Sequence, residues 1–245
     1  MDDSRRNILK TVFITYAVVS AIVAVGVRLK YNVPLVGNVG AALIAISLLY
    51  LPVVVSWRFR RDEDLITYGF VFEPVRRGLA FAGGYVLVVL PIFVIVFVSF
   101  FQLACDTGLS RLVPDQMCRQ FLGWTNAKGP TINLEFWEWA LGQLVVVALT
   151  EELFFRGFLH HLLEKAIPPT RRVMGGGIGL ALLISSALFA LLHIHKTGDP
   201  RSLATFFPGL LFGWMRSATG SILASTIAHA SSNVLMRLLN QIFLR

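Results

Sequence analysis

The stretch GLAFAGGYVLVVLPIFVIVFVSFFQLA, residues 78–104, contains no charged side chain along its whole length. A helix needs about 20 mainly apolar residues to cross the roughly 30 Å of bilayer hydrocarbon, so this stretch predicts a transmembrane helix. The rest of the chain has a matching composition, because 56% of its 245 residues are hydrophobic and only 15% are charged. Soluble domains carry about 25% charged residues. The sequence therefore predicts an integral membrane protein.

Six further apolar runs follow the same pattern. They cover residues 11–27, 33–57, about 137–160, 177–194, 203–215 and 221–244. We therefore predict an all-α fold, a polytopic membrane helix bundle of about seven transmembrane helices. The range is six to eight, because the sixth run is short enough for a re-entrant or broken element.

A single membrane domain, residues 1–245, accounts for this organisation. Residues 1–133 contain three spans, an amphipathic segment at 61–78 that we expect along the membrane interface, and a long loop at 105–136. Residues 134–245 contain nearly all of the polar side chains that fall inside spans, so we expect the functional core there.

The formal net charge of +8 comes largely from short Lys and Arg clusters at span ends, namely RRNILK, RFRR, VRR and TRR. Such clusters set topology beside lipid headgroups. A basic stripe with interleaved aromatic residues is missing, which disfavours nucleic acid as a partner and leaves the lipid bilayer. The excess of Lys and Arg on one side predicts a cytoplasmic N-terminus. The first span ends in VGVRLK without a clear small-x-small cleavage site, so we expect it to be an uncleaved anchor. The short loops favour a prokaryotic inner (cell) membrane.

Both cysteines, Cys105 and Cys118, fall in the 105–136 loop. With a cytoplasmic N-terminus this loop lies outside the cytoplasm, where disulfides persist. The sequence is compatible with a disulfide between these cysteines and equally with two free thiols.

The motif EELFFR, residues 151–156, places three charges inside an apolar run. Charges are costly in hydrocarbon, so such residues are usually paired and functional. Glu152 and Arg156 are four residues apart with the acid first, which is the favourable order for a helical pair. Glu151 lies about 100° further round the helix and faces elsewhere. We therefore expect Glu152 and Arg156 to be structural, and Glu151 to be free for chemistry.

Three polar residues on later spans are candidates to meet Glu151. His193 lies as far after Arg172, the centre of the turn between two spans, as Glu151 lies before it, so an antiparallel hairpin brings both to one depth. His229 and Asn233 are four apart and share one face of the last span. A carboxylate with a histidine can activate water, and His with Asn can donate to an oxyanion.

The same residues allow other interpretations. Glu151, His193 and His229 could instead hold zinc with a water as the fourth ligand. An intramembrane histidine or asparagine can also serve helix packing alone. Other polar or small residues in the core are expected to be structural: His160, His161, His195, the G-x-x-x-G pair Gly209 and Gly213, and Arg237, which we expect to snorkel or to neutralise a site charge.

These motifs resemble the CAAX-protease and bacteriocin-processing family of intramembrane endopeptidases. EELFFR is similar to its E-E-x-x-x-R motif, FALLH (189–193) to its F-x-x-x-H element and HASSN (229–233) to its H-x-x-x-N element. The segment FPGLLFGWMRSATGSI resembles the glycine-bearing stretch before the last motif. The resemblance covers roughly residues 134–240. The first three spans resemble the family only in being transmembrane helices.

The resemblance implies an all-α membrane fold and a hydrolase that cleaves near the C-terminus of a membrane-anchored protein or peptide. The substrates implied are prenylated CAAX proteins, bacteriocins or C-terminal sorting helices. Carried over by motif, Glu151 and His193 activate water, while His229 and Asn233 hold the oxyanion. Glu152 and Arg156 support the site. We expect no cofactor, with the zinc-dependent version as the alternative.

Two other function classes remain as alternatives. One is a non-catalytic immunity or assembly partner that reuses the fold, although a scaffold has no need for all four residues together. The other is a proton-coupled transporter, in which carboxylates and histidines form a relay. Transporters commonly show paired repeats, and the sequence has none.

Overall fold

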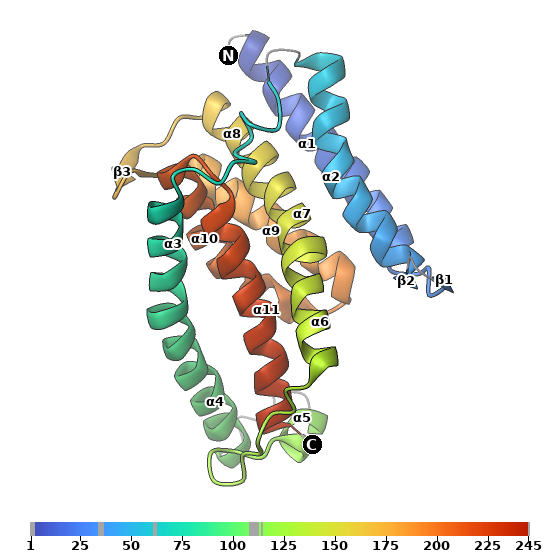
Figure 1. Ribbon diagram of the computed structural model, residues 1–245, viewed down its shortest axis with the longest axis vertical. Helices are drawn as coiled ribbons and strands as arrows, with labels where there is room; N and C mark the ends of the chain where they lie inside the picture. The colour runs from blue at the N-terminus through green and yellow to red at the C-terminus, as the bar shows by residue number, and fades with distance from the viewer. Residues whose placement is uncertain (1–2, 34–36, 61–62, 108–112, 114, 245) are drawn as a thin grey trace.

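The computed structural model describes residues 3–33, 37–60, 63–107, 113 and 115–244, and the chain is almost entirely helical. Figure 1 labels most of the elements. The helices are α1 (Asp3–Gly26), α2 (Val39–Phe59), α3 (Val75–Gly84), η1 (Tyr85–Val89), α4 (Leu90–Asp106), α5 (Asp115–Gln120), α6 (Leu134–Gly142), η3 (Gln143–Ala148), α7 (Leu149–Glu152), η4 (Leu153–His160), α8 (His161–Ala166), α9 (Leu180–Thr197), η5 (Pro200–Thr205), α10 (Phe206–Thr219) and α11 (Leu223–Phe243). Two short antiparallel hairpins complete the list, β1 (Asn32–Val33) with β2 (Gly37–Asn38), and β3 (Arg171–Val173) with β4 (Gly176–Ile178).

The predicted all-α membrane bundle is confirmed, and each predicted apolar run corresponds to a helix. Four helices of the described chain are long and apolar enough to cross a membrane: Ser4–Gly26, Val39–Phe59, Val75–Asp106 and Leu180–Thr197. The other three helical regions are shorter or more polar. The helix from α6 to α8 carries the charges of the EELFFR motif, α10 has 14 residues, and α11 carries the HASSN motif.

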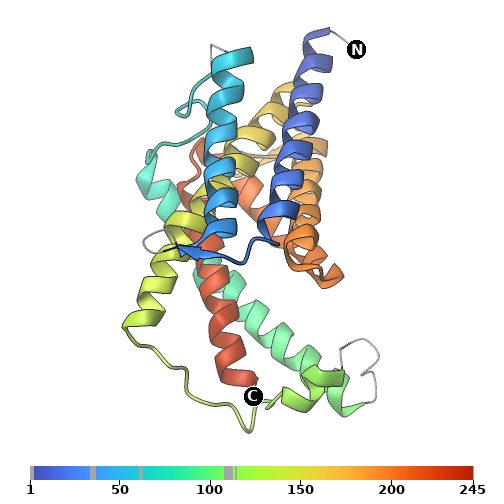
Figure 2. The same ribbon diagram turned by 90° about the vertical axis from the view of Figure 1, so that its right-hand side faces the viewer.

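The first two helices form a close antiparallel pair. A Cβ on Gly40 would overlap the backbone carbonyl of Gly26, so the end of α1 approaches the start of α2 where only glycine fits. Figures 1 and 2 show this pair beside α7, α8 and α9. Valines 12, 19 and 23 of α1 join Phe154 and Phe158 in the main hydrophobic core. The pair therefore covers the back of the helix that carries the EELFFR motif.

The C-terminal helices surround that motif from the other side. Helix α9 packs against α10, and α10 packs against α11, as Figure 1 shows. The predicted close approach at the G-x-x-x-G pair is confirmed, because a Cβ on Gly213 would lie 2.5 Å from Leu182 and 3.2 Å from His160. The turn predicted around Arg172 is formed by the β3–β4 hairpin, and the next helix begins at Leu180 rather than at residue 177.

The predicted interfacial segment at 61–78 is described from residue 63 on, as turns over 63–74 followed by the start of α3. Glu63 and Tyr68 of these turns are buried, and Tyr68 hydrogen-bonds to Ser56 of α2. Ile66, Phe70 and Phe72 are exposed. One side of the segment therefore contacts the bundle, and its position at the membrane interface stays a prediction.

The two cysteines are joined by a disulfide that links the end of α4 to α5. Residues 108–112 and 114, between them, lie outside the described residues. After α5 the chain pairs with the end of α11, because the amide of Leu122 donates to Phe243 and that of Lys128 donates to Ile242. Figures 1 and 2 show α4, α5 and the end of α11 extending beyond α1, α2 and α9, at the end of the bundle far from the N-terminus.

Candidate active site

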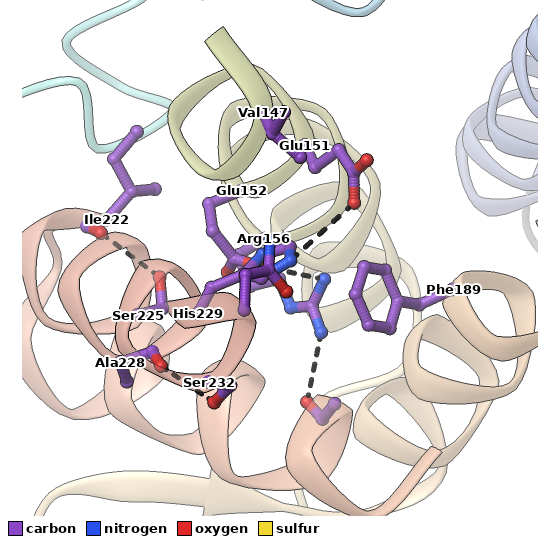
Figure 3. Close-up of polar contacts among 12 residues, drawn as sticks. Val147, Glu151, Glu152, Arg156, Phe189, Ile222, Ser225, Ala228, His229 and Ser232 are labelled. Carbon is purple, nitrogen blue, oxygen red and sulfur yellow. Dashed lines mark hydrogen bonds and ion pairs between the residues drawn. The ribbon is translucent and has the colours of Figure 1, made fainter. Parts of the chain in front are cut away.

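Two π-helical segments flank the paired glutamates. The short helix α7 ends with Glu151 and Glu152, between η3 on one side and η4 on the other. π-Type turns are rare and frequently occur at functional sites. Both glutamates are almost fully buried, at 3% and 0% exposure. The local backbone therefore places two carboxylates inside the bundle on different faces of one helix, as Figure 3 shows.

Glu152 forms the predicted pair with Arg156 and a second contact that was not predicted. Its Oε1 lies 3.2 Å from Nη1 of Arg156, and both side chains are fully buried. The same Oε1 lies 2.9 Å from Nδ1 of His229. The Arg156 guanidinium also lies 3.9 Å above the ring of Phe189 and donates to the carbonyl of Gly209 at 3.4 Å. The pair is thus structural, and it also holds His229.

Glu151 faces the other way and meets three cationic or titratable groups. Its Oε2 lies 3.8 Å from Nε2 of His193 and 3.8 Å from Nε2 of His229. Its Oε1 accepts a hydrogen bond from the Lys196 ammonium at 2.8 Å. The convergence expected from the hairpin is therefore present, with a lysine in addition.

The hydrogen bond on the far side of His193 decides which of its nitrogens can act as a base. Nδ1 lies 3.0 Å from the carbonyl oxygen of Phe189. A carbonyl only accepts, so Nδ1 carries the proton and, in the neutral ring, Nε2 presents its lone pair toward Glu151. His193 is thereby held in the form that can take a proton.

His229 is held by two aromatic rings as well as at Nδ1. The ring of Phe212 stacks on it with centroids 5.4 Å apart, and Phe189 meets it edge-on at 5.6 Å. Figure 3 shows His229 on α11 between the two glutamates of the neighbouring helix. His229 is therefore the link between the two carboxylates.

Asn233 lies one turn further along α11, and Gln143, which lies outside the sequence motifs, holds its side chain. Its side-chain amide donates to Oε1 of Gln143 at 3.0 Å. All four predicted catalytic residues, Glu151, His193, His229 and Asn233, line one cavity of about 900 Å³. The remaining lining residues are mainly polar or aromatic: Gln120, Trp139, Gln143, Val147, Lys196, Thr197, Met236, Arg237, Asn240, Gln241 and Leu244.

The donor atoms around Glu151 include a set that zinc could bind. Two imidazole nitrogens and one carboxylate oxygen point at a common region, which is a donor set that zinc can use. However, Lys196 places a positive charge on the same carboxylate, and a metal cation would have to compete with it. No group of three or more metal-binding side chains in a metal-holding arrangement occurs among the described residues. The arrangement fits a carboxylate–histidine base better than a metal centre.

Sequence reasoning missed two residues of the site. The predicted span ended at residue 194, but α9 continues to Thr197 and carries Lys196 one turn beyond His193 on the same face. Gln143 is a lone polar residue in an apolar run, two turns before Glu151, and that contrast is the signal that identifies it. His160 and His161 do not line the cavity, and His195 belongs to the last turn of α9.

The family assignment follows from the segment that builds this site. Residues 133–235 match the family model described as type II CAAX prenyl endopeptidase Rce1-like. This segment is similar to the Rce1-like family. It contains all six motif residues and nearly coincides with the 134–240 segment that the motifs indicated. The Rce1-like family is a protease family, which supports a membrane endopeptidase of the CAAX type in general. No curated protein and no solved structure matches the chain.

Proposed function

We propose that this protein is an intramembrane endopeptidase that hydrolyses a peptide bond near the C-terminus of a membrane-anchored protein or peptide. The observation that carries the proposal is the position of Glu151 Oε2, which lies 3.8 Å from the Nε2 atoms of both His193 and His229 inside a cavity of about 900 Å³. Such distances are too long for direct hydrogen bonds and suit one bridging water. Glu151 and His193 are the groups that activate it.

The nucleophilic step uses the tautomer of His193 described above. The water oxygen attacks the scissile carbonyl carbon, and the water proton passes to Glu151 or to Nε2 of His193. The carbonyl π electrons move to its oxygen, which gives the tetrahedral oxyanion. When the C–N bond breaks, the held proton passes to the leaving amine. The first products are one carboxylic acid and one amine. The acid then gives its proton to the amine, which leaves one carboxylate and one ammonium group, so atoms and charges balance.

The oxyanion is assigned to His229 and Asn233. Asn233 uses one amide hydrogen on Gln143 and has the second for a substrate oxygen. His229 already donates from Nδ1 to Glu152, so it donates from Nε2 only when it carries both protons. Glu151 and Glu152 are matched by Lys196 and Arg156, and a doubly protonated His229 then adds the positive charge that an oxyanion neutralises.

We propose a metal-free reaction, because Lys196 occupies one oxygen of Glu151. Incubation with a zinc-selective chelator should leave the cleavage rate unchanged. A loss of activity that zinc restores, and magnesium does not, would establish the zinc-dependent alternative.

We propose one membrane domain over the whole chain with the N-terminus in the cytoplasm of a prokaryotic cell. The disulfide supports this orientation, since it belongs in an oxidising compartment and lies at the end of the bundle far from the N-terminus. Gln120 and Leu244 line the cavity at that same end, which favours a site that opens away from the cytoplasm. Peptides and C-terminal sorting helices are then favoured over prenylated cytoplasmic proteins as substrates.

Labelling in intact cells tests the topology. A cysteine introduced into the loop at 105–136 should react with a membrane-impermeant maleimide if this loop lies outside the cytoplasm.

Mapping the C-terminal peptides of membrane proteins tests the function. Cells that carry the wild-type protein are compared with cells that carry Glu151→Gln or the control Glu138→Gln, which changes an exposed residue of α6. We expect substrates to keep their C-terminal segment only in the Glu151→Gln cells. Identical maps from all three strains, with the proteins at equal levels, would favour the non-catalytic partner.

A further inference from the structure

Arg237 is a cation of the cavity that the proposed reaction does not use. It lies on α11, two helical turns beyond His229 and one turn beyond Asn233, and it lines the cavity with them. Its guanidinium lies 4.4 Å above the ring of Trp139 and 5.8 Å from that of Phe136. The two aromatic rings hold the guanidinium in one place while leaving its N–H groups available.

The charges in the cavity make Arg237 different from the other cations. Arg156 is paired with Glu152, and Lys196 is paired with Glu151. Within the described part of the chain, Arg237 makes no ion pair and no hydrogen bond. A half-buried arginine in a membrane protein normally has an anionic or polar partner. Of the two roles expected for Arg237, neutralisation of a site charge has no carboxylate partner among the described residues, because Glu151 and Glu152 are paired with other cations.

A second group beside Arg237 also has no partner. Gln241 follows Arg237 by one turn on α11 and lines the same cavity, and its buried Oε1 has no hydrogen-bond partner among the described residues. Buried amide oxygens are normally hydrogen-bonded. Arg237 offers donors and Gln241 offers an acceptor, which together suit the end of a peptide chain.

We propose that Arg237 binds the free C-terminal carboxylate of the substrate and that Gln241 accepts a hydrogen bond from the peptide N–H near that end. This inference rests on the proposed function, and it adds the residue that selects substrates with a free C-terminus. The pairing is specific, because a guanidinium can bind both carboxylate oxygens in parallel. An amide or an ester at the same position would lose the charge and one of the two acceptors.

Binding of two matched peptides tests the carboxylate site without requiring turnover. The protein in phosphatidylcholine nanodiscs is titrated with N-acetyl-trileucine, which has a free carboxylate, and with its C-terminal amide. The variants are Arg237→Gln, Arg237→Lys and, as a control, Arg119→Gln, which removes an exposed arginine of α5 that does not line the cavity. All are measured in a Glu151→Gln background as well, so that the result does not depend on catalysis.

We expect the acid to bind about 10- to 100-fold more tightly than the amide, as a charge-assisted hydrogen bond implies. Arg237→Gln should bring the acid to the affinity of the amide and leave the amide unchanged, while Arg119→Gln keeps the preference. Arg237→Lys should keep part of it, because the charge remains and the parallel geometry is lost. Equal affinities in the wild-type protein, no measurable binding of the acid, or a preference that survives Arg237→Gln would overturn the proposal. Addition of phosphatidylglycerol that abolishes the preference would instead assign Arg237 to a lipid phosphate. If the protein shows no protease activity, these binding measurements still test the role of Arg237.

Discussion

Nδ1 of His229 lies 2.9 Å from Oε1 of Glu152, the same oxygen that lies 3.2 Å from the Arg156 guanidinium. Glu152 therefore has two roles, since it neutralises a buried arginine and fixes the ring of a proposed catalytic histidine. Experiments can separate these roles, because neutralisation of Arg156 affects stability, whereas the position of the His229 ring affects the reaction.

Glu152→Met should destabilise the protein strongly, by about 3–5 kcal/mol, because it leaves the fully buried Arg156 without its anion. The double variant Glu152→Met with Arg156→Met should recover most of this loss, since an apolar pair of similar size replaces the ion pair. Thermal unfolding in detergent measures both. The double variant should still be inactive, because His229 has lost its acceptor. An active double variant would show that Glu152 serves packing alone.

Lys196→Met should reduce the rate of cleavage by about tenfold or more, because the ammonium that holds Oε1 of Glu151 is removed from a preorganised site. The melting temperature should fall less than in Glu152→Met, since the Lys196 side chain is 35% exposed and Glu151 lines the cavity. Lys165→Met is the matched control, because it removes an ion pair to Glu63 that lies away from the cavity. Equal rates for wild type and Lys196→Met would exclude Lys196 from the positioning of Glu151.

Glu63 should make stability depend on pH at the N-terminal end of the bundle. Burial raises its pKa, but hydrogen bonds and charges from Arg60 and Lys165 outweigh burial and lower the pKa from 4.5 to about 2. Because the folded-state pKa is the lower one, the stabilisation is fully present above about pH 4.5 and disappears as the pH falls toward 2. The buried Tyr68 hydroxyl also donates to Glu63, and burial raises its pKa.

The difference in unfolding temperature between wild type and Glu63→Gln measures this effect. The difference should be constant from pH 7 down to about 5 and should shrink between 4.5 and 2. The exposed Glu138→Gln variant should show no such trend. A Glu63→Gln difference that is independent of pH would indicate that packing, and not charge, is responsible.

Gly40→Ala should destabilise the α1–α2 pair by about 1–3 kcal/mol, because the new methyl group would overlap the Gly26 carbonyl and lie 2.8 Å from that of Leu29. Gly83→Ala is the control, since a Cβ on Gly83 meets nothing within 4 Å. In that helix alanine should be neutral or stabilising by up to about 1 kcal/mol. Thermal unfolding of the two variants side by side checks the difference. Similar melting temperatures would mean that the helices can separate at Gly40 without cost.

The membrane class and the main site residues were predictable because hydrocarbon penalises polar groups. In an apolar chain, Glu151, His193, His229 and Asn233 stand out, and helical spacing alone separates Glu151 from the Glu152–Arg156 pair. Contacts that depend on where a helix ends could not be predicted in the same way. Lys196 joins the site because α9 continues past residue 194, where the apolar run stops.

The buried contacts of the turns at 63–74 escaped prediction for a related reason. Tyr68 and Glu63 are buried through contacts with Ser56 and Lys165, which are close in space but not in a helical pattern. An amphipathic sequence predicts that one face is covered, but not whether lipid or protein covers it.

The most direct test of the account is the rate at which purified protein in nanodiscs cleaves a substrate identified by C-terminal mapping. Glu151→Gln keeps the size of the side chain and the hydrogen bond from Lys196 to an oxygen, but it removes the base. We predict a loss of about 10²- to 10⁴-fold relative to wild type, with Glu138→Gln unaffected. A folded Glu151→Gln protein that cleaves at the wild-type rate would contradict the central claim that Glu151 activates the water.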